Sequence, residues 1–194
     1  NNMTFKAIIF DADGMIVHVE RVSDRLRLSP EVAAPFFNHG FQRCVVGKAD
    51  LKQEVQQYLD SWNWKSGVDD LLSFWFDSAE NRIDERFAQV IRSLRARGIK
   101  TYIATNNERY RTADLFEKRG LGTWFDGVFS SSALGFKKPQ SEFFQQIFSI
   151  IPEKKDEVLF WDDDILNVKG ARAFGLQAEQ YRDFEAFKNY VHVL

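Results

Sequence analysis

The chain has 194 residues, of which 44% are hydrophobic and 28% charged, so it can bury the core of a full domain and still carry an insertion. Its formal net charge of -2 excludes a broad electrostatic attraction for nucleic acid or an anionic membrane. A single cysteine, Cys44, cannot form an internal disulfide, and no apolar stretch is long enough for a signal peptide or a membrane span. We therefore expect a cytoplasmic protein with a small-molecule partner, and we leave its oligomeric state open.

Five short apolar runs predict β-strands, at residues 5–10, 100–104, 127–130, 158–161 and 176–179. Segments with helical periodicity lie between or after these runs, at residues 85–97, 107–119, 140–151 and 167–174. The first of these segments has apolar residues at Phe87, Val90, Ile91 and Leu94 and stops at Gly98, as a helix should. The alternation predicts a doubly wound, Rossmann-like α/β fold with a parallel sheet of about five strands.

The connection between the first and second predicted strands is the exception, because it is far longer than one crossover helix requires. Helical patterns occur within it at residues 31–37, 51–62 and 68–76. We interpret residues 18–82 as a helical cap inserted into a core of residues 1–17 and 83–194, with hinges near 16–20 and 81–84. We expect most of the cap's aromatic residues to pack its own core and one or two to line a pocket. These residues are Phe36, Phe37, Phe41, Trp62, Trp64, Phe74, Trp75 and Phe76.

Two carboxylates follow the first strand, Asp11 and Asp13, and a glycine turn at Gly14 comes next. Residues i and i+2 of a strand lean to the same side, so both acids are expected to project together at the strand's carboxyl end. Adjacent negative charges raise each other's pKa unless a cation or ligand is present, which favours a nucleophile beside a proton carrier. Ordinary turn chemistry at a strand end is the alternative interpretation.

Polar residues also follow the second and third strands. Thr105 and Asn106 precede a predicted helix, where a hydroxyl and backbone amides can bind an anion, although either residue could simply cap that helix. Lys138 stands before Pro139, which fits the first position of the next helix, and its ammonium could neutralise a phosphoryl group. Lys137 is the alternative inward residue, and both lysines could instead be solvated.

Three consecutive acids, Asp162, Asp163 and Asp164, follow the fourth apolar run, with Asn167 shortly after them. Such a cluster at the end of a buried strand is costly without a cation, and an all-oxygen site near phosphate suits Mg²⁺. The alternative is a solvated acidic turn. All four polar patches lie at the same predicted edge of the sheet, which is where this fold class binds ligands.

In their order and residue types, these patches resemble the four motifs of the haloacid dehalogenase superfamily, specifically its phosphatase branches with a helical cap between the first two motifs. The resemblance implies that Asp11 attacks phosphorus and that Asp13 is the acid and base. It also implies phosphoryl binding and Mg²⁺ binding by further residues. These are Thr105, Asn106 and Lys138 for the phosphoryl oxygens, and Asp11, the Asp13 carbonyl and Asp163, supported by Asp162, for Mg²⁺. Met15, where threonine is frequent, and Asp164, where serine is frequent, depart from the family pattern.

We therefore expect a Mg²⁺-dependent phosphomonoester hydrolase that acts on a small phosphorylated metabolite, with a sugar phosphate preferred, through an aspartyl-phosphate intermediate. The cap is expected to close over the site and bind the leaving group. His39, Arg43 and Lys48 are candidate cap contacts, although each could equally be an ordinary surface residue. His18 and His192 have no partners at metal-ligand spacing and are interpreted as structural or exposed.

Other functions remain open at this stage. A phosphoryl-transfer enzyme such as a sugar phosphomutase would use the same core residues, and a non-catalytic phosphate-binding module is a further alternative. Dehalogenation needs no acid for a halide leaving group, so Asp13 counts against it. The arginines Arg92, Arg95 and Arg97 have the spacing of a solvated helix face and do not predict a nucleic-acid surface.

Overall fold

The central strand of the sheet is β1 (Ala7–Phe10), whose four residues are all buried in the computed structural model, which describes residues 4–194. The strand order is β5-β4-β1-β6-β7 and every pairing is parallel. The other strands are β4 (Lys100–Thr105), β5 (Gly127–Ser130), β6 (Val158–Asp162) and β7 (Gln177–Gln180). The predicted doubly wound α/β fold with five parallel strands is therefore confirmed.

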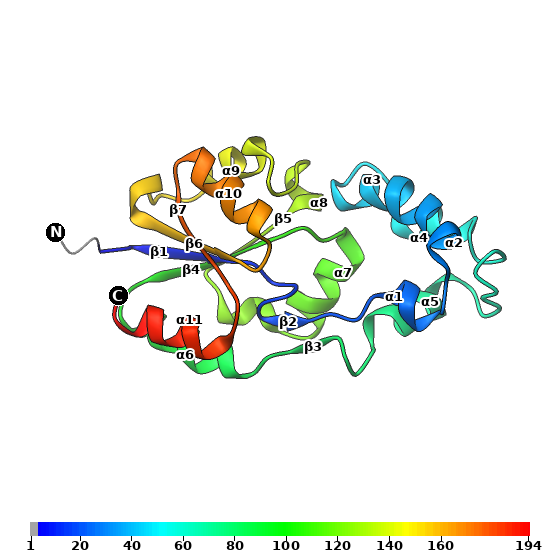
Figure 1. The fold of residues 1–194 in the computed structure, drawn as a ribbon, viewed down its shortest axis with the longest axis horizontal. Helices are drawn as coiled ribbons and strands as arrows, with labels where there is room; N and C mark the ends of the chain where they lie inside the picture. The colour runs from blue at the N-terminus through cyan, green and yellow to red at the C-terminus, as the bar shows by residue number, and fades with distance from the viewer. Residues whose placement is uncertain (1–3) are drawn as a thin grey trace.

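Helices cover both faces of this sheet (Figure 1). Alternate residues of β1 point to opposite faces. Ile8 and Phe10 pack with α6 (Arg86–Ala96) and α11 (Phe184–His192), whereas Ala7 and Ile9 pack with α9 (Ser141–Phe148) and α10 (Ile165–Phe174). A shorter helix, α7 (Arg109–Ala113), continues as the π-helical segment η2 (Asp114–Lys118), and α8 (Ser131–Leu134) follows β5. The sheet is thus buried on both sides, and its carboxyl edge is left for ligands.

The cap lies beyond that carboxyl edge (Figure 1). Its helical segments are α1 (Val22–Arg25), α2 (Pro30–Pro35), η1 (Phe36–Gly40), α3 (Phe41–Val45), α4 (Leu51–Gln56) and α5 (Val68–Phe76). Phe36, Trp62 and Leu71 are buried in a hydrophobic core of its own. The helix predicted at residues 51–62 ends early, at Gln56, and the one predicted at 31–37 runs on through the π-helical η1 into α3. The division at residues 18 and 82 remains our interpretation.

Two short strands that the sequence did not reveal join the cap to the core. β2 (Val17–His18) pairs antiparallel with β3 (Arg82–Ile83), so the outgoing and returning chains lie side by side. Asp84 stabilises this connection between cap and core. Its backbone N–H donates to Ile16 O at 2.8 Å, and its carboxylate accepts from Arg86 at 2.7 Å and from His18 at 3.2 Å. His18 is therefore structural, whereas His192 is exposed near the end of α11. None of the helices described for residues 4–194 combines the length and apolar character needed to span a bilayer.

Candidate active site

Asp11 and Asp13 lie in a turn after β1 rather than on the strand itself. Asp11 N still donates to Trp161 O at 2.9 Å, but the chain then folds back, with Val17 N donating to Ala12 O at 2.9 Å. β1 ends at Phe10, so the two acids follow the strand and project from this turn, not from alternate positions of an extended strand. Both carboxyl groups nevertheless line one cavity of about 250 Å³ at the carboxyl edge of the sheet.

Lys138 is the cation of this cavity. Its ammonium is buried and donates to Asp11 Oδ1 at 2.7 Å, to Asp162 Oδ2 at 2.8 Å and to the Ala104 carbonyl at 2.7 Å. Burial alone would lower the pKa of Lys138, but the two carboxylates raise it above its ordinary value, so the ammonium stays charged. Lys137 instead reaches Gln42 of the cap at 2.8 Å, so Lys138 is the inward residue, as we predicted.

The helix after Lys138 begins later than we predicted. Pro139 does not occupy the first helical position, because α9 begins at Ser141 with Gln140 as its N-cap. The segment is held by Asn106, whose amide accepts from Lys138 N at 2.9 Å and donates to Lys138 O at 3.0 Å. Both side-chain ends of Asn106 are thus engaged with the backbone of Lys138, so this side chain positions the lysine.

Thr105 is buried at the end of β4, and the side chain two residues further along links it to Asp13. Asn107 Nδ2 donates to Thr105 Oγ1 at 2.7 Å and to Asp13 Oδ2 at 3.0 Å. Sequence reasoning missed Asn107, although it is the second amide of the pair that follows the strand. Neither Thr105 nor Asn106 caps α7, because Glu108 is the N-cap and accepts from Tyr110 N at 2.9 Å.

Asp13 is arranged to carry a proton. Its Oδ1 atom is buried and, among the described residues, has no hydrogen-bond partner. Burial raises the pKa of the Asp13 carboxyl, although the nearby Arg111 guanidinium and the Asn107 amide partly oppose this shift. Arg111 is itself buried, pairs with Asp114 at 3.3 Å and was not identified from the sequence.

The three consecutive acids at the end of β6 have different roles. Asp162 is fully buried, and its carboxylate accepts from Lys138, from Asn167 Nδ2 at 3.2 Å and from Asp164 N at 2.9 Å. Asp164 caps α10 by accepting from Leu166 N at 2.8 Å, so its carboxylate is used within the helix end. Asp163 is left to face Asp11.

Three carboxyl oxygens, one each from Asp11, Asp162 and Asp163, lie within 4.8 Å of one another. Burial is the largest cause of the raised pKa of Asp11 and of Asp163. Three carboxyl groups this close together favour a bound cation, and an all-oxygen donor set suits Mg²⁺. Gly14 is adapted to this arrangement, because a Cβ there would lie 2.2 Å from Asp163 Oδ2. The residues therefore fit a magnesium ion.

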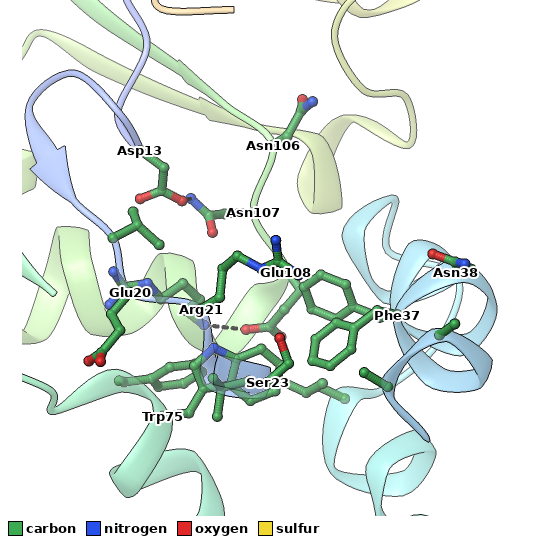
Figure 2. Close-up of a pocket in the computed structure, with 18 of the residues that line it drawn as sticks. Asp13, Glu20, Arg21, Ser23, Phe37, Asn38, Trp75, Asn106, Asn107 and Glu108 are labelled. Carbon is green, nitrogen blue, oxygen red and sulfur yellow. Dashed lines mark hydrogen bonds between the residues drawn. The ribbon is translucent and has the colours of Figure 1, made fainter. Parts of the chain in front are cut away.

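A second, larger cavity opens between this site and the cap, with a volume of about 520 Å³ (Figure 2). Asp13 and Asn106 line both cavities, so the two adjoin at these side chains. The cap residues proposed as contacts, His39, Arg43 and Lys48, do not line this larger cavity, and all three are exposed. Met15, one of the two departures from the family pattern, packs in the hydrophobic core and does not line the smaller cavity.

Comparison with known proteins gives the same family as the motifs. The chain matches the haloacid dehalogenase-like hydrolase family over residues 5–175. It is 33% identical to a phosphatase of Mycobacterium tuberculosis over 91% of this chain and 87% of that protein. It is 27% identical to a sesquiterpene phosphatase of Aspergillus oryzae over 89% and 88% of the two chains.

Solved structures show the same fold. A haloacid dehalogenase family enzyme of Bacteroides thetaiotaomicron superposes with a TM-score of 0.84 at 14% identity, covering 96% of this chain and 98% of that one. A further structure of that enzyme, in complex with magnesium and inorganic phosphate, has a TM-score of 0.76 at 14% identity and covers 94% and 98%. On this evidence, the chain belongs to the haloacid dehalogenase-like hydrolases.

Proposed function

We propose that this protein is a Mg²⁺-dependent phosphomonoester hydrolase that works through an aspartyl-phosphate. The observation that carries the proposal is the convergence of Asp11, Asp13, Thr105, Lys138 and Asp163 on one small cavity, although they come from four separate segments: the turn after β1, the end of β4, the loop between α8 and α9, and the loop after β6. Phosphate transfer needs an in-line nucleophile, charge neutralisation and a proton for the leaving oxygen. Each requirement has a residue in the cavity.

Asp11 is the proposed nucleophile. Its Oδ1 atom is held by Lys138, which orients the carboxylate toward the cavity. Attack by an Asp11 oxygen on phosphorus forms the acyl phosphate and breaks the bond to the substrate's alkoxide oxygen. Asp13 donates its proton to that oxygen, and its free Oδ1 supports this role. Asp13 then accepts a proton from the water that hydrolyses the acyl phosphate and releases inorganic phosphate.

The phosphoryl oxygens are proposed to contact the Thr105 hydroxyl and the Lys138 ammonium, both of which line the cavity. Asn107 orients the Thr105 hydroxyl and Asp13 at once, because its amide donates to both. Asn106 contributes by holding the backbone of Lys138 in place. Asp11, Asp163 and the Asp13 carbonyl are proposed to hold Mg²⁺, with Asp162 behind them. When bound, the ion neutralises charge on the phosphoryl group.

The names of two relatives support phosphatase activity in particular, since the proteins of Mycobacterium tuberculosis and Aspergillus oryzae are both called phosphatases. The proposed substrate is a small phosphorylated metabolite, whose phosphoryl group would occupy the small cavity. Transfer to a second hydroxyl would use the same residues, so release of inorganic phosphate without an acceptor is the distinguishing observation.

The test is a phosphate-release assay with p-nitrophenyl phosphate in the presence and absence of Mg²⁺. We expect turnover that EDTA abolishes and excess Mg²⁺ restores. Asp11→Asn should lower kcat by at least about a thousandfold, since the nucleophile is removed. Asp13→Asn should slow turnover and accumulate a phosphoenzyme that is stable in acid and cleaved by hydroxylamine, as an acyl phosphate is. Activity of Asp11→Asn at the wild-type level would refute the mechanism.

A further inference from the structure

We propose that the alcohol portion of the substrate is apolar, so that the enzyme hydrolyses phosphomonoesters of hydrocarbon-like alcohols. This inference rests on the phosphatase function proposed above and concerns only the leaving group. It departs from the sugar phosphate that the sequence led us to prefer. The evidence is the composition of the larger cavity, the occupation of its polar groups and its position next to Asp13.

The walls of the larger cavity are mainly apolar, and aromatic rings form much of the cap side. Its apolar residues include Val22, Ala33, Phe37, Phe41, Trp75 and Phe76. Trp75 forms the corner of a small aromatic group, with ring centroids 5.8 Å from Phe37 and 5.7 Å from Phe41. Figure 2 shows Phe37 and Trp75 on the cap side, across the cavity from Asp13. The volume of about 520 Å³ is within the range of pockets that enclose drug-sized organic ligands.

Four of the charged and amide side chains around this cavity, those of Glu20, Asn106, Asn107 and Glu108, are bound to other parts of the protein, whereas the buried Nη2 of Arg111 has no hydrogen-bond partner among the described residues. Glu108 caps α7 and is buried, and Glu20 accepts a hydrogen bond from Ser78 and pairs with Arg25 at 3.4 Å. The amides of Asn106 and Asn107 are engaged as described above. Burying sugar hydroxyls against apolar walls without new partners costs free energy for every unpaired group. Burying an aliphatic group in the same space is favourable, because apolar surface is removed from water.

The position of the cavity makes it the binding site of the leaving group. Asp13 and Asn106 belong to both cavities, so an ester whose phosphoryl group contacts Lys138 and Thr105 places its carbon chain beyond Asp13, under the cap. The unpaired Oδ1 of Asp13 lies at this junction, where the leaving oxygen must be protonated. Walls that contact only the leaving group select substrates without disturbing the phosphoryl site.

The experiment measures kcat/KM for butyl, hexyl and octyl phosphate and for glucose 6-phosphate, at saturating Mg²⁺ and below the critical micelle concentration of each ester. Each buried methylene should raise kcat/KM by about fourfold. Octyl phosphate should therefore exceed butyl phosphate by roughly 200-fold if every added methylene is buried. Glucose 6-phosphate should fall below octyl phosphate by a similar factor.

Two variants connect the preference to this cavity. Trp75→Ala removes a wall and should lower the octyl-to-butyl ratio of kcat/KM by about tenfold. Its matched control is Phe74→Ala, the preceding residue of α5, which packs on Trp64 at 5.2 Å and does not line the cavity. This control should keep the wild-type ratio. Ala34→Trp adds bulk instead of removing it and should also lower the ratio, which guards against a folding defect in Trp75→Ala.

Each outcome has a definite meaning. A steep chain-length dependence that Trp75→Ala and Ala34→Trp reduce supports the proposal. Turnover of p-nitrophenyl phosphate that depends on Asp11, combined with no preference for longer alkyl chains or with faster hydrolysis of glucose 6-phosphate, overturns it and leaves the phosphatase function standing. Absence of Asp11-dependent phosphate release from every ester overturns both. A steep dependence that the two variants leave unchanged overturns the assignment to this cavity.

Discussion

Replacement of Lys138 by methionine tests whether this residue is the counter-charge on which the candidate site depends. Methionine keeps an unbranched stem of similar length and removes only the ammonium. In the native chain Lys138 is 3% exposed, and its ammonium donates to Asp11, Asp162 and the Ala104 carbonyl, all at 2.7 to 2.8 Å. Lys138→Met therefore leaves two buried carboxylates facing one another without their shared cation.

The expected loss in the free energy of unfolding follows from the number of carboxylates that Lys138 contacts. Removing one partner of a buried ion pair lowers the free energy of unfolding by about 3–5 kcal/mol, because the remaining charge is left uncompensated. Lys138 serves two carboxylates, so we expect the upper part of this range at neutral pH without divalent ions. Asp11→Asn in the Lys138→Met background should then restore part of the stability, by about 1–2 kcal/mol, since it removes one of the opposed charges.

The assay is urea unfolding followed by circular dichroism, in EDTA, for the wild type, both single variants and the double variant. The double-mutant cycle isolates the coupling between Lys138 and Asp11. Added Mg²⁺ should stabilise Lys138→Met, because a bound ion replaces some of the missing positive charge. A loss of less than about 1 kcal/mol in Lys138→Met, or an Asp11→Asn effect that is equal in both backgrounds, would refute the reasoning.

Three further predictions concern Gly14 at the site, Asp84 at the connection between cap and core, and Cys44 in the cap core. Gly14→Ala should raise the Mg²⁺ concentration for half-maximal phosphate release by about tenfold, because its φ is +89° and its new Cβ would displace Asp163; unchanged Mg²⁺ dependence would contradict this. Arg86 holds the pKa of Asp84 at about 2, so Asp84 stabilises the fold above pH 3.8 and loses this effect as pH falls toward 2. Asp84→Asn should accordingly lose about 2 kcal/mol in urea unfolding at pH 7, with the difference from wild type vanishing near pH 2. Burial raises the pKa of the Cys44 thiol to about 12, so a thiol reagent at pH 8 should label it only after unfolding, and rapid labelling of the native protein would count against the packing.

The central strands of the sheet were predictable from the sequence because they are buried on both faces. Such strands appear as continuous apolar runs, and the run at residues 158–161 lies within β6, whose residues are all buried. β2 and β3 were missed because two-residue strands carry no periodicity. α11 was also missed, although Asp183 before Phe184, Phe187 and Val191 is an N-cap ahead of helical spacing.

The candidate site was predictable to the extent that parallel strands end at one edge. Asp11 follows β1, whereas Thr105 and Asp162 are the last residues of β4 and β6, so these three share one cavity for that reason. Lys138 joins them from the loop between α8 and α9. Asn107 was missed because its contacts with Thr105 and Asp13 depend on the loop conformation between β4 and α7. The residue pattern alone did not separate Asp162, Asp163 and Asp164, and the family resemblance assigned Mg²⁺ binding to Asp163 with support from Asp162. The role of Asp164 as the N-cap of α10 is visible only in its hydrogen bonds.

Selection of the leaving group depends on packing that a sequence pattern does not encode. Phe36 and Phe37 are neighbours with the same side chain, yet Phe36 is buried in the cap core and Phe37 lines the larger cavity. The π-helical turn η1, which starts at Phe36, sets which ring points in each direction. Phe37 also lies parallel to Trp62 and meets Trp75 at 69°, so the cavity wall and the cap core share one aromatic network. The core motifs can therefore predict phosphate chemistry, whereas the apolar character of the leaving group can be inferred only from the folded cap.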